Sequence, residues 1–136
     1  MLDKQTILKN LADKAIERLK KLPPPVVRVS GPITSGGYGY QKNLERFIKA
    51  QEMLRRQGYT VFDYFEGHND EEVIKDLNLP WEEVMCYYHQ PILASSLIKT
   101  AFLLPHWQES NGAKWEHEYF VKNGIEVVEL SENDLK

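Results

Sequence analysis

Glu116 is the residue whose type and position in this sequence most directly suggest chemistry. The apolar run at residues 101–104 predicts a buried strand, because no polar residue interrupts it. Ser110 and Asn111 both favour the N-cap of a helix, which we expect to run through Glu116 toward residues 123–124. In open α/β sheets, ligands bind beyond the carboxyl ends of strands, beside the helices that follow. The pattern therefore predicts a carboxylate beside a ligand site.

The phase of this helix predicts which way Glu116 points. Residues three and four apart share one face, so Glu116 falls on a stripe with Ala113, His117 and Phe120. If the stripe faces the sheet, Glu116 is an inward carboxylate; the alternative is a solvated glutamate on the flank of the helix. Glu118 lies on a different side. Gly112 and Ala113 have almost no side chain, so a ligand can approach the backbone closely there.

Two more predicted strands end in polar loops. Residues 26–29 are apolar except for Arg28, and the loop that follows, 30–41, is rich in glycine and hydroxyl groups. Such a loop is typical of a phosphate or sugar site, although a merely flexible loop has the same composition. A strand at 59–62 leads into Asp63. In a parallel sheet these loops meet at one edge with 105–111, which predicts a cleft lined by Ser30, Gly31, Tyr38, Asp63, Ser110 and the helix bearing Glu116.

The remaining elements complete an α/β pattern. Helices are expected at 3–22, 43–57 and 81–98, the last broken or kinked at Pro91. A last strand is expected at 125–130 and a polar tail at 131–136. Residues 67–80 predict a mobile loop or a short helix over the site, and their acidic residues are more typical of a surface than of a metal site.

Length and composition indicate one domain of 136 residues with a net charge of −3. This charge gives no general attraction to nucleic acid or to an anionic membrane, and no apolar run approaches the ~20 residues of a membrane span. The single cysteine, Cys86, fits a reducing compartment, so we expect a cytoplasmic protein. We divide the chain into an amphipathic helix with a proline spacer, 1–25, and a domain, 26–136. The apolar stripe of that helix must pack against the domain or against a second subunit.

Two signatures in the sequence resemble a known family. The first is Ser30-Gly31-Pro32-Ile33-Thr34, followed by the helix from Asn43 and by Gly58-Tyr59-Thr60-Val61. The second is Leu104-Pro105-His106-Trp107, then Ser110, Gly112-Ala113 and Glu116. Together they resemble the nucleoside 2-deoxyribosyltransferase-like superfamily, most closely its small bacterial and phage branch. The resemblance runs from about Val26 to Leu130.

The resemblance implies a flavodoxin-like three-layer α/β fold with a parallel sheet of four to five strands. It also implies cleavage or transfer at the N-glycosidic bond of a nucleoside 5′-monophosphate or nucleoside, without cofactor or metal, in a homo-oligomer. Glu116 would be the nucleophile, and Asp63, Tyr38 and His106 are candidates for protonating the leaving group. The implied substrate-binding residues are Ser30, Gly31, Pro32, Ile33, Thr34, His106, Trp107, Ser110, Gly112 and Ala113.

The sequence also departs from the family pattern. Lys99 and Thr100 stand where many members carry an aspartate, His106 replaces a glycine, and Asp63 stands where the branch often has asparagine. These differences keep open an alternative, a non-catalytic nucleotide-binding or regulatory module of the same fold. In the enzyme hypothesis, Ser110 at the helix start helps to hold a 5′-phosphate.

Overall fold

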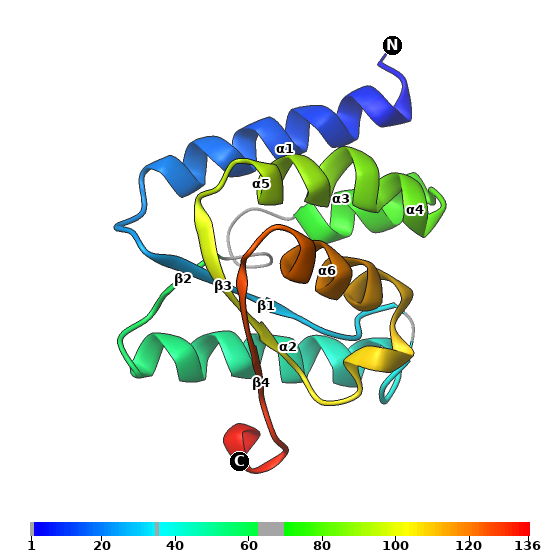
Figure 1. The fold of residues 1–136 in the computed structure, drawn as a ribbon. Helices are drawn as coiled ribbons and strands as arrows, with labels where there is room; N and C mark the ends of the chain where they lie inside the picture. The colour runs from blue at the N-terminus through cyan, green and yellow to red at the C-terminus, as the bar shows by residue number, and fades with distance from the viewer. Residues whose placement is uncertain (1, 35, 63–69) are drawn as a thin grey trace.

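A four-stranded parallel sheet forms the centre of the structure, a computed structural model that describes residues 2–34, 36–62 and 70–136 (Figure 1). The strand order is β2-β1-β3-β4. The strands are β1 (Val26–Ser30), β2 (Thr60–Val61), β3 (Ile98–Leu103) and β4 (Glu126–Glu129). With helices on both sides, this is the flavodoxin-like three-layer α/β fold expected from the sequence.

The helices lie in two layers. Helix α2 (Tyr40–Arg56) covers one side of the sheet, whereas α1 (Lys4–Lys20) and α5 (Gln90–Ala94) lie on the other (Figure 1). Helix α6 (Asn111–Lys122) lies on the same side of the sheet as α1 and α5. Glu116 of α6 and His89, the residue just before α5, both contact Arg28 of β1. From β1 the chain continues to β2 on one side of it, and then crosses back to β3 on the other side of β1. The direction of the strand order therefore reverses between β1 and β3, which makes this the topological switch point.

Helix α1 docks on its own domain. Asp3 caps it by accepting a hydrogen bond from the Thr6 amide at 2.7 Å, a role that aspartate strongly favours. The apolar stripe is fully buried and consists of Leu8, Ala12, Ala15 and Leu19. Arg18 also pairs with the buried Asp70 at 3.1 Å, and Asp70 accepts a hydrogen bond from the Tyr88 hydroxyl at 2.6 Å. The stripe therefore needs no second subunit to cover it, and the homo-oligomer remains a prediction.

The helical run from residue 81 to residue 94 is interrupted, as Pro91 predicts. Helix α4 (Trp81–Val84) passes into a π-helical turn, η1 (Met85–His89), before α5 begins. Proline has no amide hydrogen and its ring clashes with the carbonyl four residues earlier, and the wider turn relieves both conflicts. The run ends at Ala94 rather than 98, because Ile98 begins β3 and is buried in the core.

Two acidic or polar segments are more ordered than their composition indicates. Residues 70–77 form a short helix, α3 (Asp70–Leu77), and Asp70 and Glu71 are buried, so the expectation of an acidic surface is wrong for these two. Within the described ranges, no three acidic, histidine or cysteine side chains group as metal ligands would. The C-terminal tail contains a 3₁₀ turn, η3 (Asn133–Leu135), whose Leu135 is buried.

None of the helices described has the length and apolar character needed to cross a bilayer.

The docking of α1 predicts the effect of trimming its apolar stripe. We expect Leu19→Ala to lower the free energy of unfolding by about 2–5 kcal/mol, because the side chain is fully buried and its loss leaves a cavity. Urea denaturation followed by circular dichroism measures the change. Leu2→Ala, at an exposed position, is the control and should change stability by less than about 0.5 kcal/mol. A cost for Leu19→Ala that depends on protein concentration would instead place the stripe against a second subunit.

Candidate active site

A buried ion pair joins the central strand to helix α6. Arg28 Nη2 lies 2.8 Å from Glu116 Oε2, and the two side chains are only 3% and 8% exposed. Arg28 and Ser30 alternate with valines along β1, so they point toward α6 while Val27 and Val29 point away from it. Ala113, Glu116 and Phe120 form the buried face of α6, which confirms the predicted inward position of Glu116.

His89 completes this buried cluster from η1. Its Nδ1 lies 3.5 Å from Arg28 Nη2 and 3.9 Å from Glu116 Oε2. A guanidinium has no lone pair to offer, so Nδ1 accepts and the imidazole is neutral. Burial, aided by the positive charge of Arg28, holds the pKa of His89 well below its usual value.

The carboxylate of Glu116 experiences opposing effects. Burial raises its pKa, whereas the Arg28 guanidinium and the Ser30 hydroxyl favour the charged form and limit the rise. Arginine stays protonated at any ordinary pH, and a buried guanidinium without an anion is very costly. The ion pair thus favours the ionised form of Glu116 and opposes the effect of burial.

These charges lie at the floor of a cavity of about 360 Å³. That volume is at the lower end of the range for small-molecule sites. The cavity lies beyond the carboxyl end of β1 and beside the first residues of α6. The polar and charged lining comprises Arg28, Thr34, Glu71, Lys75, Asn78, His89, Ser110, Asn111 and Glu116. The apolar lining includes Ile33, Phe47, Ile74, Leu79, Trp81, Val84 and Met85.

Most of the residues predicted from the two signatures gather at this cavity. Its lining contains Gly31, Ile33, Thr34, Ser110, Gly112, Ala113 and Glu116. Ser110 is the N-cap of α6, because its Oγ accepts a hydrogen bond from the Ala113 amide at 3.2 Å. Gly31 is required by space, since a Cβ there would lie 2.6 Å from Leu104 Cβ. Ser30 is buried behind the lining, beside the Glu116 carboxylate.

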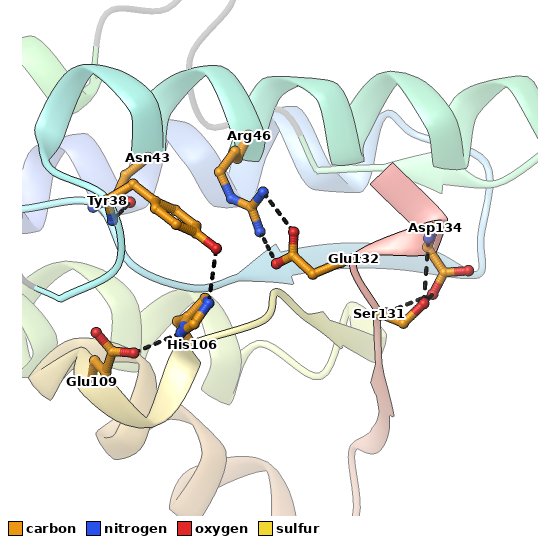
Figure 2. Close-up of polar contacts among 8 residues, drawn as sticks. All are labelled: Tyr38, Asn43, Arg46, His106, Glu109, Ser131, Glu132 and Asp134. Atoms are coloured by element: carbon orange, nitrogen blue, oxygen red, sulfur yellow. Dashed lines mark hydrogen bonds and ion pairs between the residues drawn. The ribbon is translucent and has the colours of Figure 1, made fainter. Parts of the chain in front are cut away.

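Tyr38 and His106 lie in a second cluster outside the cavity lining (Figure 2). The Tyr38 hydroxyl lies 3.0 Å from His106 Nε2, and His106 Nδ1 lies 2.7 Å from Glu109 Oε2. Glu109 also accepts a hydrogen bond from the Gly37 amide at 3.0 Å. Arg46 of α2 stacks over the Tyr38 ring at 4.7 Å. This cluster joins the glycine-rich loop to the turn after β3, so its present contacts are structural.

Two other predicted residues, Pro32 and Trp107, do not line the cavity, and a third, Asp63, is not among the residues that the structure describes. Pro32 is buried but does not line the cavity. Trp107 stacks on His117, and its indole nitrogen donates a hydrogen bond to Glu129 Oε1 at 2.9 Å. Asp63 lies outside the described residues, so its predicted role remains a prediction. The catalytic roles predicted for Tyr38 and His106 also remain predictions.

Lys99 and Thr100, which replace the expected aspartate, lie near the start of β3. The cavity lies at the opposite edge of the sheet, beyond the strand ends, and neither residue lines it. Thr100 donates a hydrogen bond to Glu126 at 3.0 Å on the neighbouring strand. The absence of an acid at these two positions therefore leaves the carboxylates of the cavity unchanged.

Sequence reasoning missed three important groups in the lining. The local pattern places Arg28 only within a strand, although a single cation inside an apolar, central strand is itself a signal for a buried partner. His89 carried no local signal, because it sits within an apolar helix. Composition predicts that Glu71 lies on an acidic surface, yet it is buried and lines the cavity.

Comparison with known proteins identifies the family. A family model described as "Domain of unknown function (DUF4406)" matches residues 25–129. No curated protein and no solved structure matches the chain. The matched segment begins after α1 and contains Arg28, His89 and Glu116.

The neutral, buried state of His89 predicts a pH dependence of stability. Because the folded pKa lies well below the ordinary 6.5, the stabilising contribution is complete above 6.5 and is lost as the pH falls, when the unfolded chain takes up the proton. Between about pH 7.5 and about pH 5, we expect this residue to lower the free energy of unfolding by about 2 kcal/mol.

Urea denaturation of the wild type and of His89→Gln across this range measures the effect. The variant should lack this part of the acid sensitivity, whereas His117→Gln, on the half-buried flank of α6, should retain it. Parallel pH profiles for the wild type and His89→Gln would contradict a neutral, buried His89.

Proposed function

The chain belongs to the DUF4406 family of domains of unknown function, and we propose that it cleaves or transfers the N-glycosidic bond of a nucleoside 5′-monophosphate or nucleoside. The observation that carries this proposal is the buried carboxylate of Glu116 at the floor of the cavity, paired with Arg28. The two sequence signatures that resemble the nucleoside 2-deoxyribosyltransferase-like superfamily add independent support, because Glu116 is the position they identify as the nucleophile.

In the proposed reaction, a Glu116 oxygen attacks the anomeric carbon of the sugar. The C–N bond breaks, its electron pair leaves with the base, and a glycosyl ester forms on Glu116. Water, or the nitrogen of a second base, then attacks the same carbon and the ester bond breaks, which restores the carboxylate. The negative charge of Glu116 also stabilises the oxocarbenium-like centre that develops in both steps.

The leaving base needs a proton, and Glu71 is the candidate that the cavity offers. Glu116 and Glu71 are the two carboxyl groups in the described lining, and retaining glycosidases use two carboxyl groups. A protonated Glu71 would protonate the base in the first step and take a proton from water in the second. Glu71 therefore joins Asp63, Tyr38 and His106 as a candidate for this role.

One observation favours the second candidate function, a non-catalytic nucleotide-binding module. Arg28 already occupies one oxygen of Glu116, and a carboxylate held by a guanidinium is less nucleophilic than a free one. In this alternative the ion pair is purely structural, and the cavity binds a nucleotide without cleaving it. Release of free base separates the two functions.

The first test replaces the proposed nucleophile. We expect Glu116→Gln to reduce base release from a panel of nucleosides and nucleoside 5′-monophosphates by roughly 10³-fold or more, because glutamine cannot form the glycosyl ester. Chromatography of the free base measures the rate. Glu118→Gln, exposed on another side of α6, is the matched control and should leave the rate unchanged.

This variant also leaves Arg28 without its anion, so a loss of about 3–5 kcal/mol of stability is expected alongside the loss of rate. The double variant Arg28→Met/Glu116→Gln removes both charges, and it should recover much of that stability while remaining inactive. Base release by either folded variant at the wild-type rate would show that Glu116 is not the nucleophile. Nucleotide binding by the wild type without base release would favour the binding module.

The second test concerns the proposed 5′-phosphate contact of Ser110. Its Oγ accepts from the Ala113 amide, but the hydroxyl hydrogen remains available to donate to an anion at the start of α6. As an N-cap alone, Ser110→Ala should cost about 1 kcal/mol of stability and leave substrate preference unchanged. As a phosphate ligand, it should also raise KM for monophosphates and spare the matching nucleosides. Equal wild-type activity on a nucleoside and its monophosphate would contradict the phosphate contact.

A further inference from the structure

Three side chains on one face of the helical run 81–94 form one wall of the cavity. Trp81, Met85 and His89 recur every four residues, and all three line the cavity. His89 forms the deep end beside Arg28 and Glu116, and Met85 packs against the first turn of α6, where a Cβ on Gly112 would lie 3.4 Å from its sulfur. Trp81, at the other end, is 40% exposed, so it stands at the rim.

Among the described residues, Trp81 differs from the other two tryptophans because its indole makes no ring contact. Trp107 stacks on His117 with ring centroids 4.4 Å apart, and Trp115 stacks on Tyr119 at 5.6 Å. Throughout the described ranges, no other ring or cation packs against the indole of Trp81, although it borders the cavity. A large aromatic side chain left half-exposed at the rim of a cavity is a surface on which a planar ligand group can stack.

The chemistry of the cavity is divided in a matching way. Arg28, Glu116 and the neutral His89 gather at the floor, and Glu71 and Lys75 of α3 also border the cavity. Trp81 has the apolar side chains of Leu79, Val84 and Ile74 among its companions in the lining. A ligand with a sugar at one end and a planar heterocycle at the other meets both requirements. The sugar reaches the carboxylate, and the heterocycle stays near the rim.

We propose that Trp81 is the stacking platform for the base of the bound nucleotide, and that the site therefore recognises the aromatic heterocycle as well as the sugar. This inference rests on the proposed function for the orientation of the ligand, with its anomeric carbon at Glu116. Stacking is tolerant of base identity because every base has a π face, so Trp81 selects for a planar base rather than for one base.

The test compares ligands with and without a base. Isothermal titration measures binding of the common nucleoside 5′-monophosphates and of ribose 5-phosphate to the wild type, Trp81→Phe and Trp81→Ala. We expect Trp81→Ala to weaken monophosphate binding by about 5- to 150-fold and to leave ribose 5-phosphate binding unchanged. Trp81→Phe should retain most of the affinity, because phenylalanine keeps an aromatic face. Trp115→Ala, whose ring stacks on Tyr119 away from the cavity, is the control.

Three results would overturn the inference: unchanged monophosphate affinity in Trp81→Ala, an equal loss for monophosphates and ribose 5-phosphate, or no monophosphate binding by the wild type. The fate of the proposed chemistry is read separately, from base release. Trp81-dependent binding without base release would support the stacking role of Trp81 and contradict the proposed enzymatic activity. Base release by Trp81→Ala at the wild-type kcat/KM would support the proposed enzymatic activity and contradict the stacking role of Trp81.

Discussion

The buried ion pair between Arg28 and Glu116 constrains the rest of this structure. Each charge would be too costly to bury alone, so strand β1 and helix α6 must stay within contact distance for the fold to be stable. The same pair contributes to the electrostatics of the cavity: Arg28 opposes the rise that burial causes in the pKa of Glu116, and it adds to the effect of burial in lowering the pKa of His89. One strand and one helix thus place a carboxylate and its paired guanidinium at the floor of the cavity.

Topology explains why this pair lies beside an opening rather than within a sealed core. At the switch point, the segments after β1 and β3 leave toward opposite sides of the sheet, so a gap forms beyond the strand ends. The helical run from residue 81 provides one wall of that gap, and the π turn before Pro91 forms part of this wall. Helix α3 provides another, and Arg18 and Tyr88 hold its first residue, Asp70. Helix α1 thereby supports the cavity without lining it.

The glycine-rich loop owes its conformation to polar contacts with neighbouring elements. The buried Asn43 of α2 donates to the carbonyls of Ile33 and Gly36 and accepts from the Tyr38 amide. Tyr38, His106 and Glu109 then join the same loop to the turn after β3 (Figure 2). These contacts connect the loop that contributes Gly31, Ile33 and Thr34 to the cavity lining with its neighbouring elements. Residue type in a loop does not by itself separate catalysis from architecture.

Local order in the sequence determined most of the secondary structure and the inward position of Glu116. Helical period, the Asp3 and Ser110 caps and Pro91 act over a few residues, so they can be read directly from the chain. The partner of Glu116, the burial of Glu71 and the separation of Tyr38 from the cavity depended on the tertiary structure. These features join residues far apart in the chain, and sheet order and the side taken by each crossover decide which faces meet. Periodicity predicts that a side chain points inward, but only packing decides what it meets there.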